Sequence, residues 1–252
     1  MLPDSATIIG SPVSPYVRKV LAVCEIKGIP YQLDPIVPFF GDDRFSELSP
    51  LRRIPVFVDD DVSLCDSTVI CEYLEERYPM PRVLPTGLAH RSQARWIEEF
   101  SDTRMGDVFV WQIFYEAVIL PFVFQRARDK AKIAAAVTEQ MPNVMAYLEK
   151  IAPAGGFIFG ELSIADLAIA FPFSNLKWAR VEPDVSRWPR ACAWVERTLA
   201  TTAPAKLTRI ADKLVQTAPD RHRVALVDLG VQLTDATIAG DKPRSSIMLD
   251  RV

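Results

Sequence analysis

Strand and helix signals alternate along residues 1–80, and this order restricts the fold more than any other feature of the sequence. Apolar and turn residues predict a strand at residues 5–11, a helix at 16–26, a strand at 31–33, a short helix at 42–48, a hairpin at 56–64 and a helix at 67–78. The second strand can lie parallel to the first, and the hairpin adds an antiparallel edge. We therefore expect residues 1–80 to form an α/β domain with a mixed four-stranded sheet.

The sequence changes character after this region. Prolines and a glycine interrupt the pattern and predict a linker at residues 81–88. Helical periodicity then predicts helices at residues 90–100, 105–120, 129–151, 164–176 and 190–199. Charge divides at the same place, because residues 1–80 carry a net charge of −6 and the remainder a net charge of +3. We expect an all-α domain at residues 89–206.

Residues 207–252 form an extension whose role the sequence leaves open. Alternate positions are apolar, which is the spacing of a strand, at Ala225, Val227, Leu229, Val231 and Leu233. Three interpretations remain: an added strand, an arm that binds a partner, or an apolar segment packed on the helices.

The composition argues against several classes of protein. With 29 Lys and Arg against 32 Asp and Glu, the chain lacks the basic surface that phosphate neutralisation requires, so we expect no nucleic-acid partner. The four cysteines include no C-x-x-C pair and the two histidines have no ligand spacing, so we expect a reduced, cytoplasmic environment and no metal. The most apolar stretch, residues 108–124, is interrupted by Glu116 and Pro121, so we expect no membrane span.

The first candidate functional residue lies where the first strand gives way to its helix. Proline favours the first position of a helix, so Pro15 places Ser14 at the N-cap. By spacing alone, Ser14 serves to cap the helix. The same corner presents unpaired N–H groups and a partial positive charge, so a hydroxyl there can donate a hydrogen bond to a bound thiolate. Both interpretations remain open at this point.

Two further corners have the same character. Pro55 precedes a strand, and a cis Ile54–Pro55 bond would leave the N–H and C=O of Ile54 to a peptide-like ligand. Asp66 and Ser67 stand at the entry to the next helix, where either side chain can cap it. In the functional alternative, Asp66 pairs with an ammonium group while Ser67 holds a carboxylate, and together they bind the head of an α-amino acid.

In this order, the corners resemble those of the cytosolic glutathione transferase superfamily. The similarity is carried by SPYVRKV at residues 14–20, PLRRIPVF at 50–57, LCDSTVICEYLEERYP at 64–79 and FGELSIAD at 159–166. It implies a thioredoxin-like domain that binds glutathione, followed by an all-α domain that holds an electrophilic small molecule, in a homodimer. The extension beyond residue 207 has no counterpart in this resemblance.

The resemblance assigns the glutathione sulfur to the first corner. Ser14 would donate to the sulfur, with Ser11 as the alternative donor. Tyr16 is expected among the binding contacts only, because it lies inside the predicted helix. Neither Cys24 nor Cys65 is placed to replace the serine.

The other two corners would hold the rest of the tripeptide. Ile54 would pair through its backbone with the cysteinyl part, beside a cis Pro55. Arg53, or alternatively Arg52, would meet the glycyl carboxylate. The γ-glutamyl group would be held by the acidic–serine pair, Asp66 and Ser67.

Serine at the sulfur position implies a particular chemistry. A serine hydroxyl forms no disulfide, so it favours conjugation, in which the thiolate of bound glutathione, as co-substrate, attacks an electrophile, a reaction of detoxification. Peroxidase, isomerase or dehalogenase activity of the same thiolate is an alternative, as is a non-catalytic ligand-binding protein of the same fold.

The helix predicted at residues 105–120 is apolar almost all round, which suits a core or a dimer interface. In the functional alternative, one of its faces lines the electrophile pocket with Phe109, Gln112 and Tyr115. Ser163 and Asp166, by contrast, have the S-x-x-D spacing of a capping box. We expect Asp166 to act in stability rather than in glutathione binding.

Overall fold

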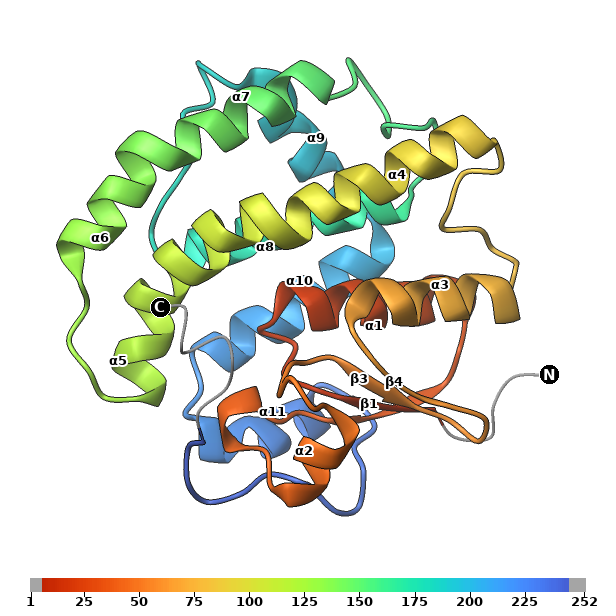
Figure 1. Cartoon of the computed structure of the whole chain (residues 1–252), viewed down its shortest axis with the longest axis vertical. Helices are drawn as coiled ribbons and strands as arrows, with labels where there is room; N and C mark the ends of the chain where they lie inside the picture. The colour runs from red at the N-terminus through yellow and green to blue at the C-terminus, as the bar shows by residue number, and fades with distance from the viewer. Residues whose placement is uncertain (1–5, 245–252) are drawn as a thin grey trace. The chain divides into compact units, whose positions relative to one another are not determined.

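The computed structural model describes residues 6–244, and their contacts divide the chain into two units (Figure 1). The first unit combines the chain up to Arg82 with the chain from Lys206 onward, and the second is Val83–Ala205. The C-terminal region therefore belongs with the N-terminal sheet rather than with the helices that precede it.

A mixed sheet of four strands forms the centre of the first unit, as the sequence predicts. Its strands are β1 (Ala6–Ile9), β2 (Tyr31–Asp34), β3 (Val56–Val58) and β4 (Ser63–Cys65), in the order β2-β1-β3-β4. β1 pairs parallel with β2 and antiparallel with β3, which pairs antiparallel with β4. The first unit's helices up to residue 82 are α1 (Pro15–Lys27), η1 (Pro38–Phe40), α2 (Asp43–Leu48) and α3 (Ser67–Arg77), and α1 packs beside α3. The thioredoxin-like prediction is confirmed.

A buried ion pair joins the ends of the two longer helices. Lys27, the last residue of α1, donates from Nζ to Glu75 Oε2 at 2.6 Å, and both side chains are almost fully buried. The same ammonium donates to the carbonyl oxygens of Tyr78 and Pro81, each at 2.7 Å. Because a buried charge is costly unless it is paired and hydrogen-bonded, these contacts fix the chain where it leaves the unit.

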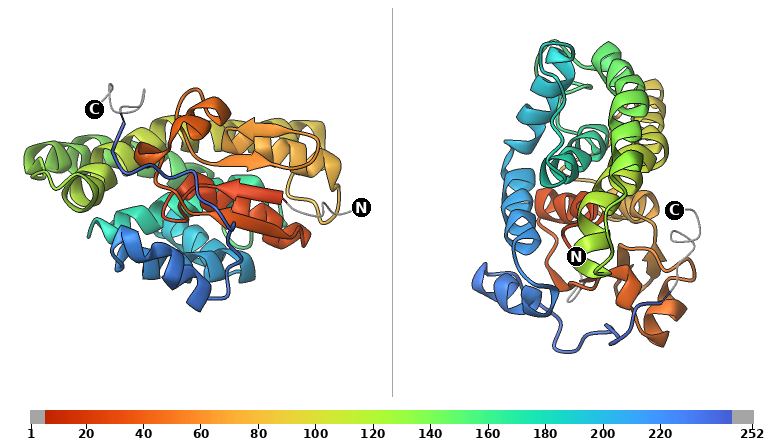
Figure 2. Two further views of the ribbon diagram at one scale, coloured as in Figure 1. Left: turned by 90° about the horizontal axis from the view of Figure 1, so that it is seen from below. Right: turned by 90° about the vertical axis from the view of Figure 1, so that its left-hand side faces the viewer.

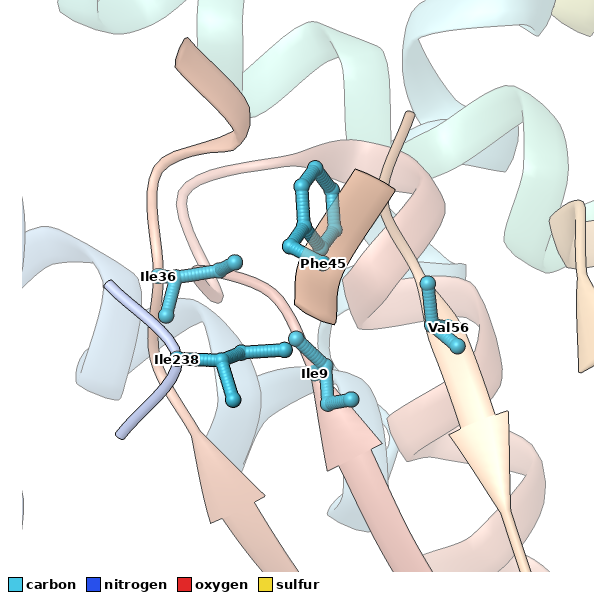
Figure 3. Packing of buried hydrophobic residues seen from close by; sticks show 5 residues of the cluster. All are labelled: Ile9, Ile36, Phe45, Val56 and Ile238. Atoms are coloured by element: carbon cyan, nitrogen blue, oxygen red, sulfur yellow. The ribbon is translucent and has the colours of Figure 1, made fainter. Parts of the chain in front are cut away.

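Five buried side chains from distant parts of the sequence form a hydrophobic cluster in this unit (Figure 3). Two come from β1 and β3, one from α2 and one from the chain after β2. The fifth comes from the C-terminal region. They are Ile9, Val56, Phe45, Ile36 and Ile238.

The C-terminal region contributes helices and an extended segment to the first unit. Helix α10 (Thr202–Val215) is followed by η4 (Pro219–Arg221) and α11 (His222–Asp228). The strand-like spacing noted in the sequence is wrong for Ala225 and Val227, because both lie in α11. Leu233, farther along, does join the sheet through an isolated parallel bridge to Leu33 of β2.

The second unit is entirely helical in its regular structure, which confirms the predicted all-α domain. Helices α4 (Leu88–Phe100), η2 (Ser101–Ile119) and α5 (Leu120–Val123) form one continuous helix. Helices α6 (Lys130–Ala135), η3 (Ala136–Gln140) and α7 (Met141–Ile151) follow one another directly. Helix α8 (Ile164–Trp178) packs against α4, η2 and α9 (Pro189–Leu199) (Figure 2). By length and composition alone, Leu88–Val123 is apolar enough to cross a membrane, but just over half of its most apolar window is buried inside the structure, as in a core helix.

Asp166 at the start of α8 binds four donors although its side chain is fully buried. Oδ2 accepts from the N–H of Ser163 at 2.9 Å and from its hydroxyl at 2.7 Å, which is the predicted capping box. Oδ1 accepts from the indole N–H of Trp194 at 2.7 Å and from the N–H of Ile158 at 3.1 Å. The carboxylate therefore joins the start of α8 to α9 and to the loop before α8.

Candidate functional site

The strand register brings the three predicted corners to one end of the sheet. Ile9 at the end of β1 pairs with Val56 at the start of β3, and Val56 pairs with Cys65 at the end of β4. Because β3 runs antiparallel to its two neighbours, the chain leaves β1 and β4 and enters β3 at the same edge. The turn that contains Ser14, the Ile54–Pro55 bond and the Asp66–Ser67 pair are therefore neighbours in space.

At the first corner, Ser14 occupies the N-cap of α1. Its φ and ψ of −71° and 129° are extended, and its Oγ accepts from the N–H of Val17 at 3.4 Å. Ser14 is half-buried, and its hydroxyl proton finds no acceptor within residues 6–244. Ser11 is buried, and its Oγ accepts from the N–H of Val13 at 3.3 Å. The greater exposure of Ser14 favours it over Ser11 as a donor to a ligand.

Gly10 allows the second corner to approach the first closely. It adopts φ +143°, and a Cβ built there would lie 2.7 Å from Cγ2 of Val17 and 2.9 Å from Cβ of Ile54. Any side chain at this position would push Ile54 away from the start of α1. The Ile54–Pro55 peptide bond is cis. Among the described residues, neither the N–H nor the C=O of Ile54 has a hydrogen-bond partner.

The two arginines before Ile54 have different surroundings. The Arg52 guanidinium donates to the carbonyl oxygen of Gly41 at 2.7 Å and to the hydroxyl of Ser46, and it stacks over Phe45 at 5.4 Å. Arg52 is thereby committed to the loop and helix after β2. Arg53 is half-buried, and its buried Nε has no partner in the described part of the chain. Of the two guanidinium groups, that of Arg52 is therefore the one bound by the described residues.

At the third corner, Asp66 caps α3 from a strained backbone conformation. Its φ is +91°, and Oδ1 accepts from the N–H groups of Thr68 at 2.9 Å and Val69 at 3.3 Å. A non-glycine residue in this region costs about 1–3 kcal/mol, and such strain concentrates at binding sites. Asp66 is exposed, whereas the adjoining Ser67 is buried with its hydroxyl unbonded by any residue of the 6–244 range.

The cysteines of the first unit lie in its packed parts, and Cys65 packs against the hydrophobic cluster. Cys24 is fully buried in α1, and burial raises its pKa to about 12, so it stays protonated. Cys65 is half-buried at the end of β4, and Cys71 is buried in α3. Tyr16 is half-buried in the first turn of α1. No three His, Cys, Asp or Glu side chains group into a metal site within the described residues.

The three residues proposed for the electrophile pocket all lie in η2, within the second unit. Phe109 is fully buried, and its ring meets that of Phe173 edge-on at 5.4 Å. Gln112 exchanges hydrogen bonds with Gln140 in η3, at 3.1 and 2.5 Å. Tyr115 is buried beside other aromatic rings, and desolvation raises the pKa of its hydroxyl. These contacts describe the surroundings of each side chain, and the electrophile pocket stays a prediction.

Two features that bear on the site are missing from the sequence reasoning. Gly10 directly follows β1, and only the structure shows that Ile54 lies close to it. Ile238 packs into the cluster that also contacts Ile54, although the two belong to opposite ends of the chain. The sequence signal in this region is the alternation of apolar residues. That alternation predicts neither helix α11 nor the packing of Ile238.

Comparison with known proteins agrees with this fold. The chain combines a thioredoxin-like unit with an all-helical unit. Residues 8–82 match the glutathione S-transferase N-terminal domain, and residues 115–203 match the glutathione S-transferase C-terminal domain. The chain therefore belongs to the cytosolic glutathione S-transferase superfamily.

Individual relatives cover the chain to different extents. Stringent starvation protein A homolog of Haemophilus ducreyi is 40% identical over 80 residues, which are 32% of this chain and span only 37% of that protein. Glutathione S-transferase U1 of Arabidopsis thaliana is 24% identical over 232 residues, which are 84% of this chain and 96% of the relative. The crystal structure of a glutathione S-transferase from Sinorhizobium meliloti 1021 superposes with a TM-score of 0.75 at 25% identity, covering 88% of this chain and 99% of that one.

Proposed function

We propose that this protein is a glutathione transferase that activates the thiol of bound glutathione for attack on an electrophilic small molecule. The observation that carries the proposal is the convergence of three corners at one end of the sheet, each with polar groups that no described residue uses. The family binds glutathione, and the three corners match the chemistry of its three residues.

Each part of the tripeptide has a complementary group. The carboxylate of Asp66 suits the ammonium of the γ-glutamyl group, and the Ser67 hydroxyl suits its carboxylate. The backbone of Ile54 offers one donor and one acceptor to the cysteinyl amide groups. The half-buried guanidinium of Arg53 suits the glycyl carboxylate, because guanidinium–carboxylate hydrogen bonds are charge-assisted.

Ser14 supplies the chemistry at the sulfur. A thiol with a pKa of about 8.5 is only about 3% ionised at pH 7, and lowering that pKa by about 2 units makes about three quarters of it thiolate, for about 2.7 kcal/mol. One hydrogen bond to a charged acceptor contributes about 1.5–3 kcal/mol, and a helix N-terminus adds about 0.3–1 kcal/mol. The Ser14 hydroxyl and the start of α1 are therefore sufficient. The thiolate then forms a C–S bond with the electrophile: it displaces halide from an aryl halide, or adds to an enone or opens an epoxide, and the resulting enolate or alkoxide takes a proton from water.

A Ser14→Ala variant tests the catalytic role. With a panel of aryl halides, enones and epoxides, we expect kcat/KM to fall roughly 10- to 100-fold, because one hydrogen bond to the thiolate is lost. Ser11→Ala, in the same turn, is the matched control and should leave most of the activity. Equal activity of wild type and Ser14→Ala would contradict the proposal.

A second candidate is a non-catalytic glutathione-binding protein of the same fold. The observation that favours it is the 40% identity, over the N-terminal region, to a relative that is not named as a transferase. Binding of glutathione by both wild type and Ser14→Ala, with turnover by neither across the panel, would select this candidate. In either case we propose a cytoplasmic homodimer. Sedimentation equilibrium tests the dimer by measuring the molecular mass in solution.

A further inference from the structure

Residues 231–244, which we name the C-terminal strap, meet the edge strand β2 through an isolated parallel bridge between Leu233 and Leu33 (Figure 2). The N–H of Leu33 donates to the carbonyl oxygen of Gln232 at 2.9 Å, and the N–H of Thr234 donates to that of Leu33 at 3.2 Å. These two bonds pair the strap with the edge strand as a neighbouring parallel strand would.

A buried carboxylate fixes the strap at the end of β2. Asp34 is 3% exposed, and its Oδ1 accepts from the hydroxyl of Thr237 at 2.7 Å while Oδ2 accepts from the N–H of Ile238 at 2.9 Å. Arg223 in α11 lies 3.5 Å from Oδ1. A buried carboxylate is costly unless it is hydrogen-bonded. Asp34 is therefore satisfied mainly by the strap, which makes the docking specific.

Apolar packing connects the strap to the candidate glutathione site. Ile238 completes the cluster of Ile9, Ile36, Phe45 and Val56 (Figure 3). Ile54 packs against the same cluster. The strap thus packs, through this cluster, behind the residue whose backbone N–H and C=O have no partner among the described residues.

The strap also holds the loop to which Arg52 is bound. The carbonyl oxygen of Ile238 accepts a hydrogen bond from the N–H of Asp42 at 2.9 Å. The N–H of Arg244 donates to the carbonyl oxygen of Phe39 at 2.8 Å. The carbonyl oxygen of Gly41, in the same loop, accepts from Arg52 at 2.7 Å.

Two further contacts extend this hold to the residues beside the site. Arg244 pairs with Asp43 at the start of α2, and this contact lowers the pKa of that carboxyl. Arg52 has a positive φ of 49° and directly precedes Arg53. The strap therefore acts on the segment with Arg53 and Ile54 both through the loop and through the core.

We propose that the C-terminal strap is a positioning element of the glutathione site: its docking holds Arg53 and Ile54 in the geometry that binds the tripeptide. This inference rests on the proposed function. Coupling between two equilibria is reciprocal, so bound glutathione must stabilise the docked strap by the same factor by which the strap raises glutathione affinity.

Calorimetric titration of Ile238→Ala with glutathione is the first test. If docking falls to about a tenth of the molecules, the apparent Kd rises about tenfold, whereas kcat at saturating glutathione stays within about twofold because Ser14 is untouched. Ile238→Val should restore the wild-type Kd. Val227→Ala, an exposed position in α11, is the matched control and should leave Kd unchanged. Circular dichroism confirms that each variant is folded at the assay temperature.

Hydrogen exchange of the wild-type protein is the second test, and it needs no variant. Saturating glutathione should slow amide exchange in residues 231–244 but not in α11. An unchanged Kd in folded Ile238→Ala, or an unchanged exchange rate of the strap amides, overturns this inference. The proposed function still holds in that case, provided that the wild-type protein binds glutathione. If Ile238→Ala does not fold, Arg244→Ala replaces it and is judged by the same Kd. No binding by the wild-type protein overturns both.

Discussion

Replacing Asp166 should destabilise the protein without weakening glutathione binding. The carboxylate is fully buried and accepts four hydrogen bonds, three of them from buried donors on Ser163 and Trp194. A buried donor that loses its acceptor costs about 1–3 kcal/mol, although the Ser163 hydroxyl can rotate to another acceptor. We therefore expect Asp166→Ala to lower the free energy of unfolding by about 4 kcal/mol.

A series of variants makes this expectation specific. For a chain of this size, 1 kcal/mol corresponds to about 2–4 °C in Tm, so Asp166→Ala should lower Tm by about 8–16 °C. Ser163→Ala removes only the N-cap hydroxyl and should cost about 1 kcal/mol. Asp166→Asn keeps an acceptor on one side and should fall between the two. Scanning calorimetry measures this order.

Glutathione titration at about 15 °C, near the usual temperature of maximum stability, completes the test, because all three variants should still be folded there. Within residues 6–244, the Asp166 carboxylate accepts hydrogen bonds from Ile158, Ser163 and Trp194 alone, so the Kd for glutathione should equal that of the wild type. A loss of glutathione affinity that matches the loss of stability would refute the assignment of Asp166 to stability alone. A decrease in Tm for Asp166→Ala that is smaller than the decrease for Ser163→Ala would refute the expected loss of about 4 kcal/mol.

Three further expectations follow from the first unit. Asp66→Gly should raise the free energy of unfolding by about 1 kcal/mol, because glycine relieves the strain at φ +91° and is nearly as good an N-cap. The same variant should raise the Kd for glutathione at least about tenfold, because the carboxylate is removed. A loss of stability together with the loss of affinity would contradict this. Arg53→Gln should weaken glutathione binding with little change in Tm, whereas Arg52→Gln should lower Tm, since Arg52 binds the loop after β2; the reverse result would exchange their roles. His222 is buried, and desolvation lowers its pKa below 6.5, so the unfolded chain binds the proton more readily and stability should fall as pH drops from about 7 through that lowered pKa. The Tm difference between wild type and His222→Gln should therefore shrink at acidic pH, and a constant difference would disprove the contribution.

The sequence predicts the local features of this protein well, because local chemistry decides them. Proline at the first helical position identifies Ser14 as an N-cap, and the S-x-x-D spacing identifies the capping box of α8. The corners at Ser14, Ile54 and Asp66 converge because of the strand register. The sequence predicts the order of the strands but not their register. The choice between Arg52 and Arg53 depends on which guanidinium the loop after β2 binds, and adjacent positions give no sign of that.

The helix around Phe109 and the C-terminal strap show what periodicity does not describe. A helix that is apolar all round offers no preferred face, so the sequence does not show that Phe109 meets Phe173 while Gln112 bonds to Gln140. In the extension, an alternation of apolar residues spans the end of α11 and the start of the strap, so its period belongs to neither element. The contacts of Ile238 with the N-terminal part of the chain depend on folding over a distance that periodicity does not describe.

The central claim is that glutathione loses its thiol proton when it binds beside Ser14. Calorimetric titration at pH 7 in two buffers with different ionisation enthalpies measures the protons released on binding. The account predicts roughly 0.7 proton per site for the wild type, which is the thiolate gained on lowering the pKa by about 2 units, and close to none for Ser14→Ala. Wild-type binding without proton release, or equal release by both proteins, would contradict it.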